Sequence, residues 1–229
     1  REGYVDEEEL IAAAVETEKL SRVDLYGIGT NLTCFSFIQA DEEKMERLAE
    51  MRKKVENAAG HTLEIVSGGN SAALDLMMRG GICEGVDNFR LGESLLFGKE
   101  RSRYTFLPGT RNDGFILECE VVEAKVKPSL PWGTAGVDSY GRKPVFTNRG
   151  EKRKKVICAI GRQDFDAETA TPVDEGILIL GASSDHLMLD VTDSVKEYKV
   201  GDIVELRLGY FSVLRAFTSP YVEKIFLKK

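Results

Sequence analysis

The sequence has few cysteines and histidines, and it contains no long apolar run. Its four cysteines stand far apart without a Cys-x-x-Cys pair, so we expect free thiols, no metal site and a reducing, cytoplasmic compartment. We expect neither a membrane span nor a signal peptide, because no stretch has the required apolar length. A net charge of −7 also argues against a nucleic-acid partner, which usually needs a basic face.

The first hundred residues alternate between helix and strand patterns, with hydrophobic residues at 42% of the whole chain. Such alternation predicts parallel strands joined by helical crossovers. Three strands are too few to close an eight-stranded barrel, so either a small open sheet or part of a larger barrel is possible. The expected helices cover 6–20, 41–59 and 72–79, and the expected strands cover 23–28, 63–66 and 88–97.

The pattern changes after residue 103, where short strands follow one another at regular spacing. This spacing predicts an all-β domain. We place the boundary between two domains, 1–105 and 106–229. The expected strands of the second domain cover 115–126, 152–160, 176–180, 186–191 and 203–208, and a loop rich in proline and glycine covers 127–144.

A glycine turn separates the strand ending at Val66 from the following helix. Gly68 and Gly69 permit a tight turn and a close approach of the backbone to a ligand. Asn70 and Ser71 are suitable residues for capping the helix that follows. Together they would present free N–H groups to a phosphate or carboxylate. An ordinary strand-to-helix turn would use the same residues, and both interpretations remain open.

Two further strand ends are polar and rich in turn residues, at 29–31 and 90–93. Parallel strands end at one edge of their sheet, and ligands of α/β proteins bind at that edge. We therefore expect these segments to meet the glycine turn there. Arg90 could donate a charge-assisted hydrogen bond to a ring nitrogen or carboxylate, or it could form an ordinary salt bridge at the rim.

These motifs, in this order, resemble the pyridoxal-phosphate-dependent alanine racemase-like family, and most of all its ornithine racemase-like branch. The resemblance implies the C-terminal part of a TIM-type (β/α)8 barrel, about three βα units, followed by an all-β domain. It also implies a homodimer that interconverts L- and D-amino acids by two-base transfer of the α-proton. The segments that carry it are 25–32, 66–71, 89–98, 159–164, 180–193, 200–202 and 208–210.

The resemblance further assigns cofactor contacts to individual residues. Ser71, with backbone groups near Gly92 and Glu93, would hold the cofactor phosphate, and Arg90 would face the pyridine nitrogen. Tyr210 matches a tyrosine that reaches the phosphate, the alternative being a core tyrosine of the β-domain. The full set of expected cofactor-binding residues is Asn31, Ser67, Asn70, Ser71, Arg90, Gly92, Glu93 and Tyr210.

The chain departs from the alanine enzymes at their second catalytic base. Their tyrosine, in a Gly-Tyr-x-Asp-Gly run, is replaced by Arg162, and their Met-Asp-Gln run becomes Ser184-Asp185-His186. The candidates for this second-face role are Arg162, Asp164, Asp185 and His186, with Tyr140 as a further possibility. The intrinsic pKa of histidine suits proton transfer, although the sequence favours a purely structural role for His186.

The family's Schiff-base lysine has no counterpart in any segment here, so we expect it upstream of this chain and expect the chain alone to be inactive. Lys125, Lys127 and Lys155 are expected to face solvent. A basic amino acid such as ornithine is the expected substrate. Its side-chain ammonium could be bound by Asp138, Asp164 and Asp185, and the alternative is that these are solvated aspartates in turns. The alternative functions are a folding and dimerisation module or an unrelated phosphate-ligand protein.

Overall fold

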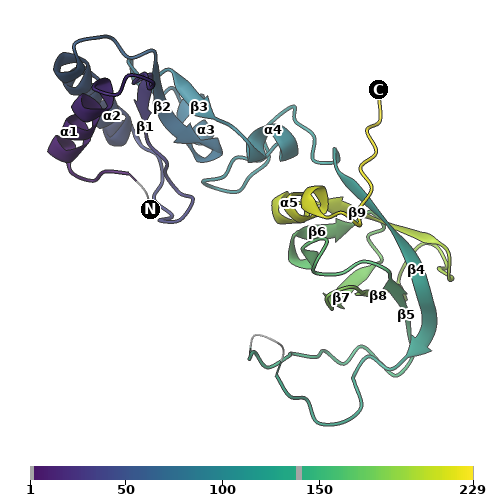
Figure 1. Cartoon of the computed structure of the whole chain (residues 1–229). Helices are drawn as coiled ribbons and strands as arrows, with labels where there is room; N and C mark the ends of the chain where they lie inside the picture. The colour runs from purple at the N-terminus through teal and green to yellow at the C-terminus, as the bar shows by residue number, and fades with distance from the viewer. Residues whose placement is uncertain (1–2, 138–140, 229) are drawn as a thin grey trace. The chain divides into compact units, whose positions relative to one another are not determined.

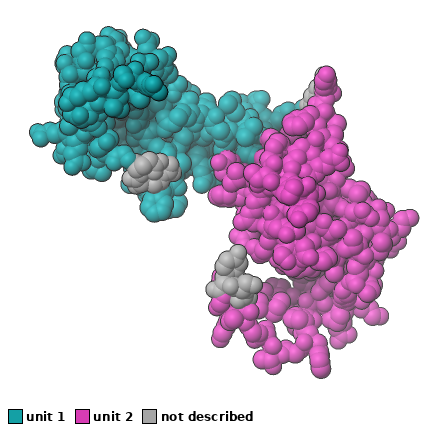
Figure 2. Space-filling model, in the orientation of Figure 1, with its two compact units in different colours: residues 1–111 teal, residues 112–229 magenta. Residues whose placement is uncertain are grey.

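The computed structural model describes residues 3–137 and 141–228. Two of the residues singled out from the sequence, Asp138 and Tyr140, lie outside these ranges. The chain divides into two compact units, Arg1–Arg111 and Asn112–Lys229 (Figure 2).

Unit 1 is built on a small parallel sheet in the order β1-β2-β3 (Figure 1). The predicted parallel arrangement with helical crossovers is thus confirmed for this unit. Asp6 and Asp41 cap their helices as expected, because each carboxylate accepts backbone N–H groups of the first turn. The elements are α1 (Glu7–Glu18), β1 (Gly27–Gly29), α2 (Glu42–Ala59), β2 (Ile65–Asn70), η1 (Ser71–Ala73), α3 (Leu74–Met78), β3 (Asn88–Arg90) and α4 (Glu93–Phe97).

The strand predicted over 88–97 is wrong in its second half. β3 ends at Arg90, and Glu93–Phe97 forms the helix α4 instead. The N–H groups of Leu95 and Leu96 both donate to the carbonyl of Gly92 at 3.1 Å, which closes the first helical turn. Of the apolar run Leu95-Leu96-Phe97, only Phe97 is buried, so a short helix buries one of these side chains and leaves the other two at the surface.

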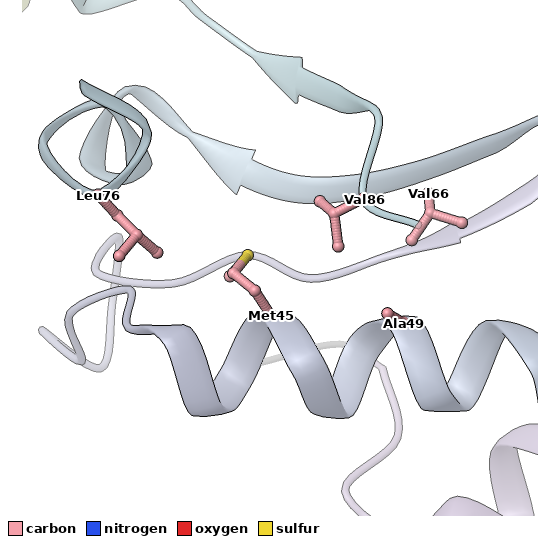
Figure 3. Close-up of a cluster of buried hydrophobic side chains, with 5 residues drawn as sticks. All are labelled: Met45, Ala49, Val66, Leu76 and Val86. Atoms are coloured by element: carbon pink, nitrogen blue, oxygen red, sulfur yellow. The ribbon is translucent and has the colours of Figure 1, made fainter. Parts of the chain in front are cut away.

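The core of unit 1 lies between α2 and the sheet. Met45 and Ala49, one helical turn apart, point from α2 toward Val66 of β2 and toward Val86 (Figure 3). Leu76 of α3 closes one end of this cluster. The strand was expected to end at Val66 before a glycine turn, but β2 continues through Gly68 and Gly69 to Asn70, so that expectation is wrong. A Cβ at Gly68 would stand 2.7 Å from a methyl of Val86, so this glycine permits close packing within the strand.

Unit 2 contains a six-stranded antiparallel sheet in the order β6-β9-β4-β5-β8-β7 (Figure 1). The long strand β4 pairs with β9 along its first half and with β5 along its second half. The outermost strands β6 and β7 approach each other, so the sheet curls until it is nearly closed. The strands are β4 (Ile116–Lys127), β5 (Arg153–Cys158), β6 (Ala170–Pro172), β7 (Leu178–Ala182), β8 (Leu187–Asp190) and β9 (Ile203–Leu208).

Unit 2 also contains helical elements that an all-β domain would lack. The helix α5 (Tyr210–Thr218) follows β9, and the short turn η2 (Ala167–Thr169) precedes β6. Ser212, Val213 and Ala216 face the interior of the unit, which is the spacing of one helix face. The expectation of purely β structure is therefore corrected. Among the described residues, no helix combines the length and hydropathy that crossing a bilayer requires.

Candidate functional site

Arg90 joins the ends of the three strands of unit 1. Its Nη2 donates to the carbonyl oxygen of Thr30 at 2.7 Å, and its Nη1 donates to the hydroxyl of Ser67. Gly29 leaves room for this arrangement, because a Cβ there would stand 3.0 Å from the Cβ of Ser67 and 3.4 Å from Nη1. The expected convergence of the strand ends is therefore present, and it places an exposed guanidinium at the edge of the sheet.

Ser71 lies where the second and third strand ends meet. Its Oγ accepts the backbone N–H groups of Gly92 and Ser94, each at 3.2 Å, and stands 3.0 Å from Ser94 Oγ. Both serines are buried, with exposed fractions of 4% and 5%. The groups that gather here are N–H and O–H donors, which is the chemistry that an anion such as phosphate requires.

Asn70 connects this region to the loop after β1. Its Nδ2 donates to Asn31 Oδ1 at 2.7 Å and to the carbonyl of Leu32 at 3.0 Å, and its Oδ1 accepts the N–H of Ala72 at 2.8 Å. Thr33, further along the loop, has a φ of +72°, which is strained for a β-branched residue. Asn70 thus caps the turn and holds Asn31 at the same edge.

Glu93, which stands between Gly92 and Ser94 in the sequence, uses its carboxylate in an ion pair. Its side chain is 12% exposed, and its Oε2 stands 3.4 Å from Nε of Arg101. This ion pair offsets a negative charge that would otherwise oppose an anion nearby. Seven of the expected cofactor-binding residues therefore lie at one edge of unit 1, which we call the strand-end cluster: Asn31, Ser67, Asn70, Ser71, Arg90, Gly92 and Glu93.

A second group of expected site residues lies around the turn between β7 and β8 in unit 2. The N–H of Arg162 donates to the carbonyl of Ser183 at 2.8 Å, and its Nε donates to the carbonyl of Ala182 at 2.8 Å. A Cβ at Gly161 would stand 2.2 Å from the backbone nitrogen of Asp185. The segment that carries Arg162 therefore packs directly against the turn that carries Asp185 and His186.

Asp185 and His186 form a hydrogen-bonded pair on this turn. Oδ1 of Asp185 stands 3.1 Å from Ser184 Oγ and 3.2 Å from Nδ1 of His186. The Ser184 hydroxyl, with a smaller contribution from His186, lowers the pKa of Asp185 below its usual value. With its Nδ1 directed at a carboxylate, the half-exposed imidazole keeps Nε2 for another partner.

The other two candidates in unit 2 have different surroundings. Asp164 is 5% exposed, and its Oδ1 accepts the hydroxyl of Ser219 at 2.6 Å. Tyr210 begins α5, and its side chain is 42% exposed, so it is a surface residue rather than the core tyrosine considered as the alternative. α5 is tied to the neighbouring segment because Arg215 Nη1 donates to the carbonyl of Arg162 at 3.0 Å.

Two contributors to the strand-end cluster were not among the expected cofactor-binding residues, although Thr30 lies in the predicted strand end 29–31. Thr30 uses its backbone carbonyl, which no side-chain pattern reports, and Ser94 follows Gly92-Glu93 without a motif of its own. The lysines expected to face solvent bind groups of their own unit. Lys125 and Lys127 pair with Glu123, and Lys155 donates to the carbonyl of Pro128 at 2.6 Å.

Two curated relatives match nearly the whole chain. It is 45% identical to the ornithine racemase of Acetoanaerobium sticklandii over 98% of this chain and 63% of the relative. It is 42% identical to the lysine racemase of Thermotoga maritima over 93% of this chain and 60% of the relative. The chain thus spans somewhat less than two thirds of the length of these relatives. No protein-family model matches it.

Solved alanine racemases share the fold. The enzyme from D-cycloserine-producing Streptomyces lavendulae aligns with a TM-score of 0.60 at 16% identity, over 99% of this chain and 63% of that one. The enzyme from Bartonella henselae, solved with covalently bound pyridoxal phosphate, aligns with a TM-score of 0.52 at 18% identity, over 86% and 52%. This likeness fits the curled antiparallel sheet of unit 2. The chain is thus similar in sequence to an ornithine racemase and a lysine racemase and similar in fold to alanine racemases, which supports an alanine racemase-like family.

Proposed function

We propose that this chain supplies the cofactor-binding edge and the second-face residues of a pyridoxal-phosphate-dependent racemase for a basic amino acid. The strand-end cluster carries the proposal, because it combines a fixed guanidinium with a set of N–H and O–H donors. The named activities of the relatives, ornithine and lysine racemase, support the reaction and the substrate class.

The residues present are compatible with pyridoxal phosphate. Ser71 and the backbone N–H groups of Gly92 and Ser94 would hold the phosphate, because they offer donors to a doubly charged anion. Asn31, Ser67 and Asn70 would shape the same edge of the sheet. Tyr210, on the surface of unit 2, is proposed as a further phosphate contact. The parallel strands of unit 1 would be three βα units of the C-terminal part of a TIM-type barrel.

Arg90 would disfavour protonation of the pyridine nitrogen that it faces. A guanidinium keeps its proton at any physiological pH, so a pyridine nitrogen beside it is disfavoured from gaining one. When bound, pyridoxal phosphate supplies an electron sink that acidifies the α-proton of an amino acid. Arg90 would weaken that sink and so restrain side reactions, because Thr30 and Ser67 hold its charge in a fixed position.

The Asp185–His186 pair is the strongest candidate for the second proton-transfer group. Asp185 Oδ1 orients the imidazole through Nδ1, so that Nε2 would accept or return the α-proton. Arg162 is less suited to act as a base because its guanidinium keeps its proton and its Nε donates to Ala182, so we assign it the role of positioning the turn. Asp164 would hold the same segment in place through its hydrogen bond with Ser219.

The substrate's side-chain ammonium would be attracted by Asp185. Its lowered pKa keeps this carboxylate charged at neutral pH. Within the described part of the chain its hydrogen bonds are made through Oδ1, which leaves Oδ2 for a cation. A basic amino acid would thus be preferred over alanine.

The cofactor-linking lysine is proposed to lie outside this chain. The described lysines of unit 1 lie on α2 or follow α1 and α4, and none of them hydrogen-bonds to the strand-end cluster. We also propose a cytoplasmic homodimer. An assembly function without catalysis is the second candidate, and the exposed apolar side chains of α5 favour it: Phe211, Leu214 and Phe217.

Borohydride reduction of the intact protein with pyridoxal phosphate, followed by peptide mapping, tests the proposal. We expect a labelled lysine outside these 229 residues and conversion of L-ornithine or L-lysine to the D form in a chiral assay. A label on a lysine within the chain would contradict the proposed division of the site. Absence of both labelling and racemisation would favour the assembly function.

A further inference from the structure

Arg162 has more of its guanidinium to offer than its positioning role uses. Its Nε donates to the carbonyl of Ala182 at 2.8 Å, which ties one side of the group to the last residue of β7. Its outer nitrogens are held less firmly, because the carboxylate of Glu168 stands 3.9 Å from Nη1, beyond hydrogen-bond range. The side chain is 34% exposed. The guanidinium is thus fixed on one side and open to a ligand on the other.

A carboxylate lies on the segment next to this guanidinium. The N–H of Arg162 donates to the carbonyl of Ser183 at 2.8 Å, and the N–H of Gln163 donates to the carbonyl of Ser184 at 3.0 Å. These two hydrogen bonds align the segment of Arg162 with the turn, and Asp185 is the next residue of that turn. The Asp185 side chain is 59% exposed and contacts His186 rather than Arg162. One surface of unit 2 therefore presents an anchored cation and an accessible anion.

A basic amino acid carries the complementary pair of charges. It has a carboxylate on its α-carbon and an ammonium group at the end of its side chain, joined by a short methylene chain. Asp185 is the proposed partner of the ammonium group, so Arg162 stands beside it as a partner for the carboxylate. A guanidinium offers two parallel N–H donors to a carboxylate and keeps its charge at any physiological pH.

We propose that Arg162 binds the α-carboxylate of the substrate through its outer nitrogens, while Asp185 binds the side-chain ammonium. This inference rests on the proposed function, because it concerns the other end of the same basic amino acid. Glu168, which is 69% exposed, would yield its place near Nη1 to the substrate carboxylate. A diamine or an amino acid with an uncharged side chain would satisfy only one of the two charged groups.

Isothermal titration calorimetry of the intact protein with three probes tests the proposal. DL-ornithine carries both charged groups, 1,4-diaminobutane lacks the carboxylate, and DL-2-aminopentanoate lacks the side-chain ammonium. The racemic forms are used so that turnover does not change the ligand. Arg162→Gln should weaken ornithine and 2-aminopentanoate about tenfold, the effect of one charge-assisted hydrogen bond, and leave diaminobutane unchanged. Asp185→Asn should instead weaken ornithine and diaminobutane and leave 2-aminopentanoate unchanged.

Two further variants control the experiment. Arg47→Gln removes an exposed guanidinium that pairs with Glu7 in unit 1, and it should change the binding of no probe. Arg162→Lys repeats the test if glutamine impairs folding. It keeps the charge but loses the parallel donors, so ornithine should bind less than tenfold more weakly and diaminobutane as in wild type.

Two results for Arg162→Gln would overturn the inference. Equal weakening of all three probes would mean that Arg162 only supports the turn, and unchanged binding of ornithine would mean that it does not contact the carboxylate. A wild-type protein that binds ornithine no more tightly than 2-aminopentanoate would instead overturn the proposed preference for a basic amino acid. The failure of this inference is therefore distinguishable from the failure of the proposed function.

Discussion

Replacing Arg90 with alanine should impair catalysis far more than folding. The side chain donates two hydrogen bonds, to the carbonyl of Thr30 and to the hydroxyl of Ser67, from an exposed position on the last residue of β3. Water can reach these partners once the side chain is removed, so the loss of stability should be about 1 kcal/mol. For a unit of this size, that corresponds to a fall in Tm of about 4–8 °C.

The catalytic effect of Arg90→Ala should be larger because a fixed charge is lost from the site. Removing one preorganised electrostatic group from an active site typically lowers kcat by about 10²–10³-fold. Arg90→Lys keeps the positive charge but lacks the planar fork that spans Thr30 and Ser67, so its kcat should fall between those of alanine and wild type.

Both variants should be assayed in the intact protein by chiral chromatography of ornithine, with thermal unfolding measured in parallel. A kcat of Arg90→Ala within threefold of wild type would refute the role assigned to the guanidinium. A loss of activity accompanied by general unfolding would instead indicate that Arg90 only joins the strand ends.

Other predictions follow from single contacts. Asp41→Ala should cost about 1 kcal/mol in urea unfolding of unit 1, because the carboxylate accepts the N–H of Lys44 at 3.0 Å, and Asp41→Asn should lose little. Gly161→Ala should lower racemase turnover without weakening cofactor affinity, because the added Cβ would displace the turn that carries Asp185. Unchanged turnover would argue against a catalytic role for that turn. Burial opposes ionisation of Asp190, but Arg153 and Thr192 outweigh it and hold the pKa of Asp190 below its usual value. The stability from this pair is therefore complete above the unfolded pKa of about 4 and is lost as the pH falls through the folded value. The urea midpoint of the wild-type chain should fall below about pH 4, and that of Asp190→Asn should fall less. An equal fall in both proteins would contradict this assignment.

Features encoded by neighbouring residues could be predicted from the sequence. Asp6 and Asp41 cap helices through contacts within three residues, so a local pattern suffices to identify them. The meeting of Arg90 with Ser67 was also predictable, because parallel strands must end at one edge.

The helix α4 could not be distinguished from a strand by its sequence, because Leu95-Leu96-Phe97 is a short apolar run and periodicity separates helix from strand only over a longer window. No element was predicted over α5, although its buried positions have the spacing of one helix face. The contacts of Ser94 with Ser71 and of Asp164 with Ser219 join residues 23 and 55 positions apart, so only the tertiary fold creates them.

The cofactor edge of unit 1 is the centre of this account, and amide chemical-shift mapping tests it most directly. Titration of the isotopically labelled chain with pyridoxine 5′-phosphate should shift the amides of Gly92 and Ser94 most strongly, since these N–H groups now donate to Ser71. Smaller shifts should follow at Ser67 and Arg90. Dominant shifts elsewhere, for example around Asp174 and Lys196 in unit 2, or no shifts at millimolar ligand, would contradict the account.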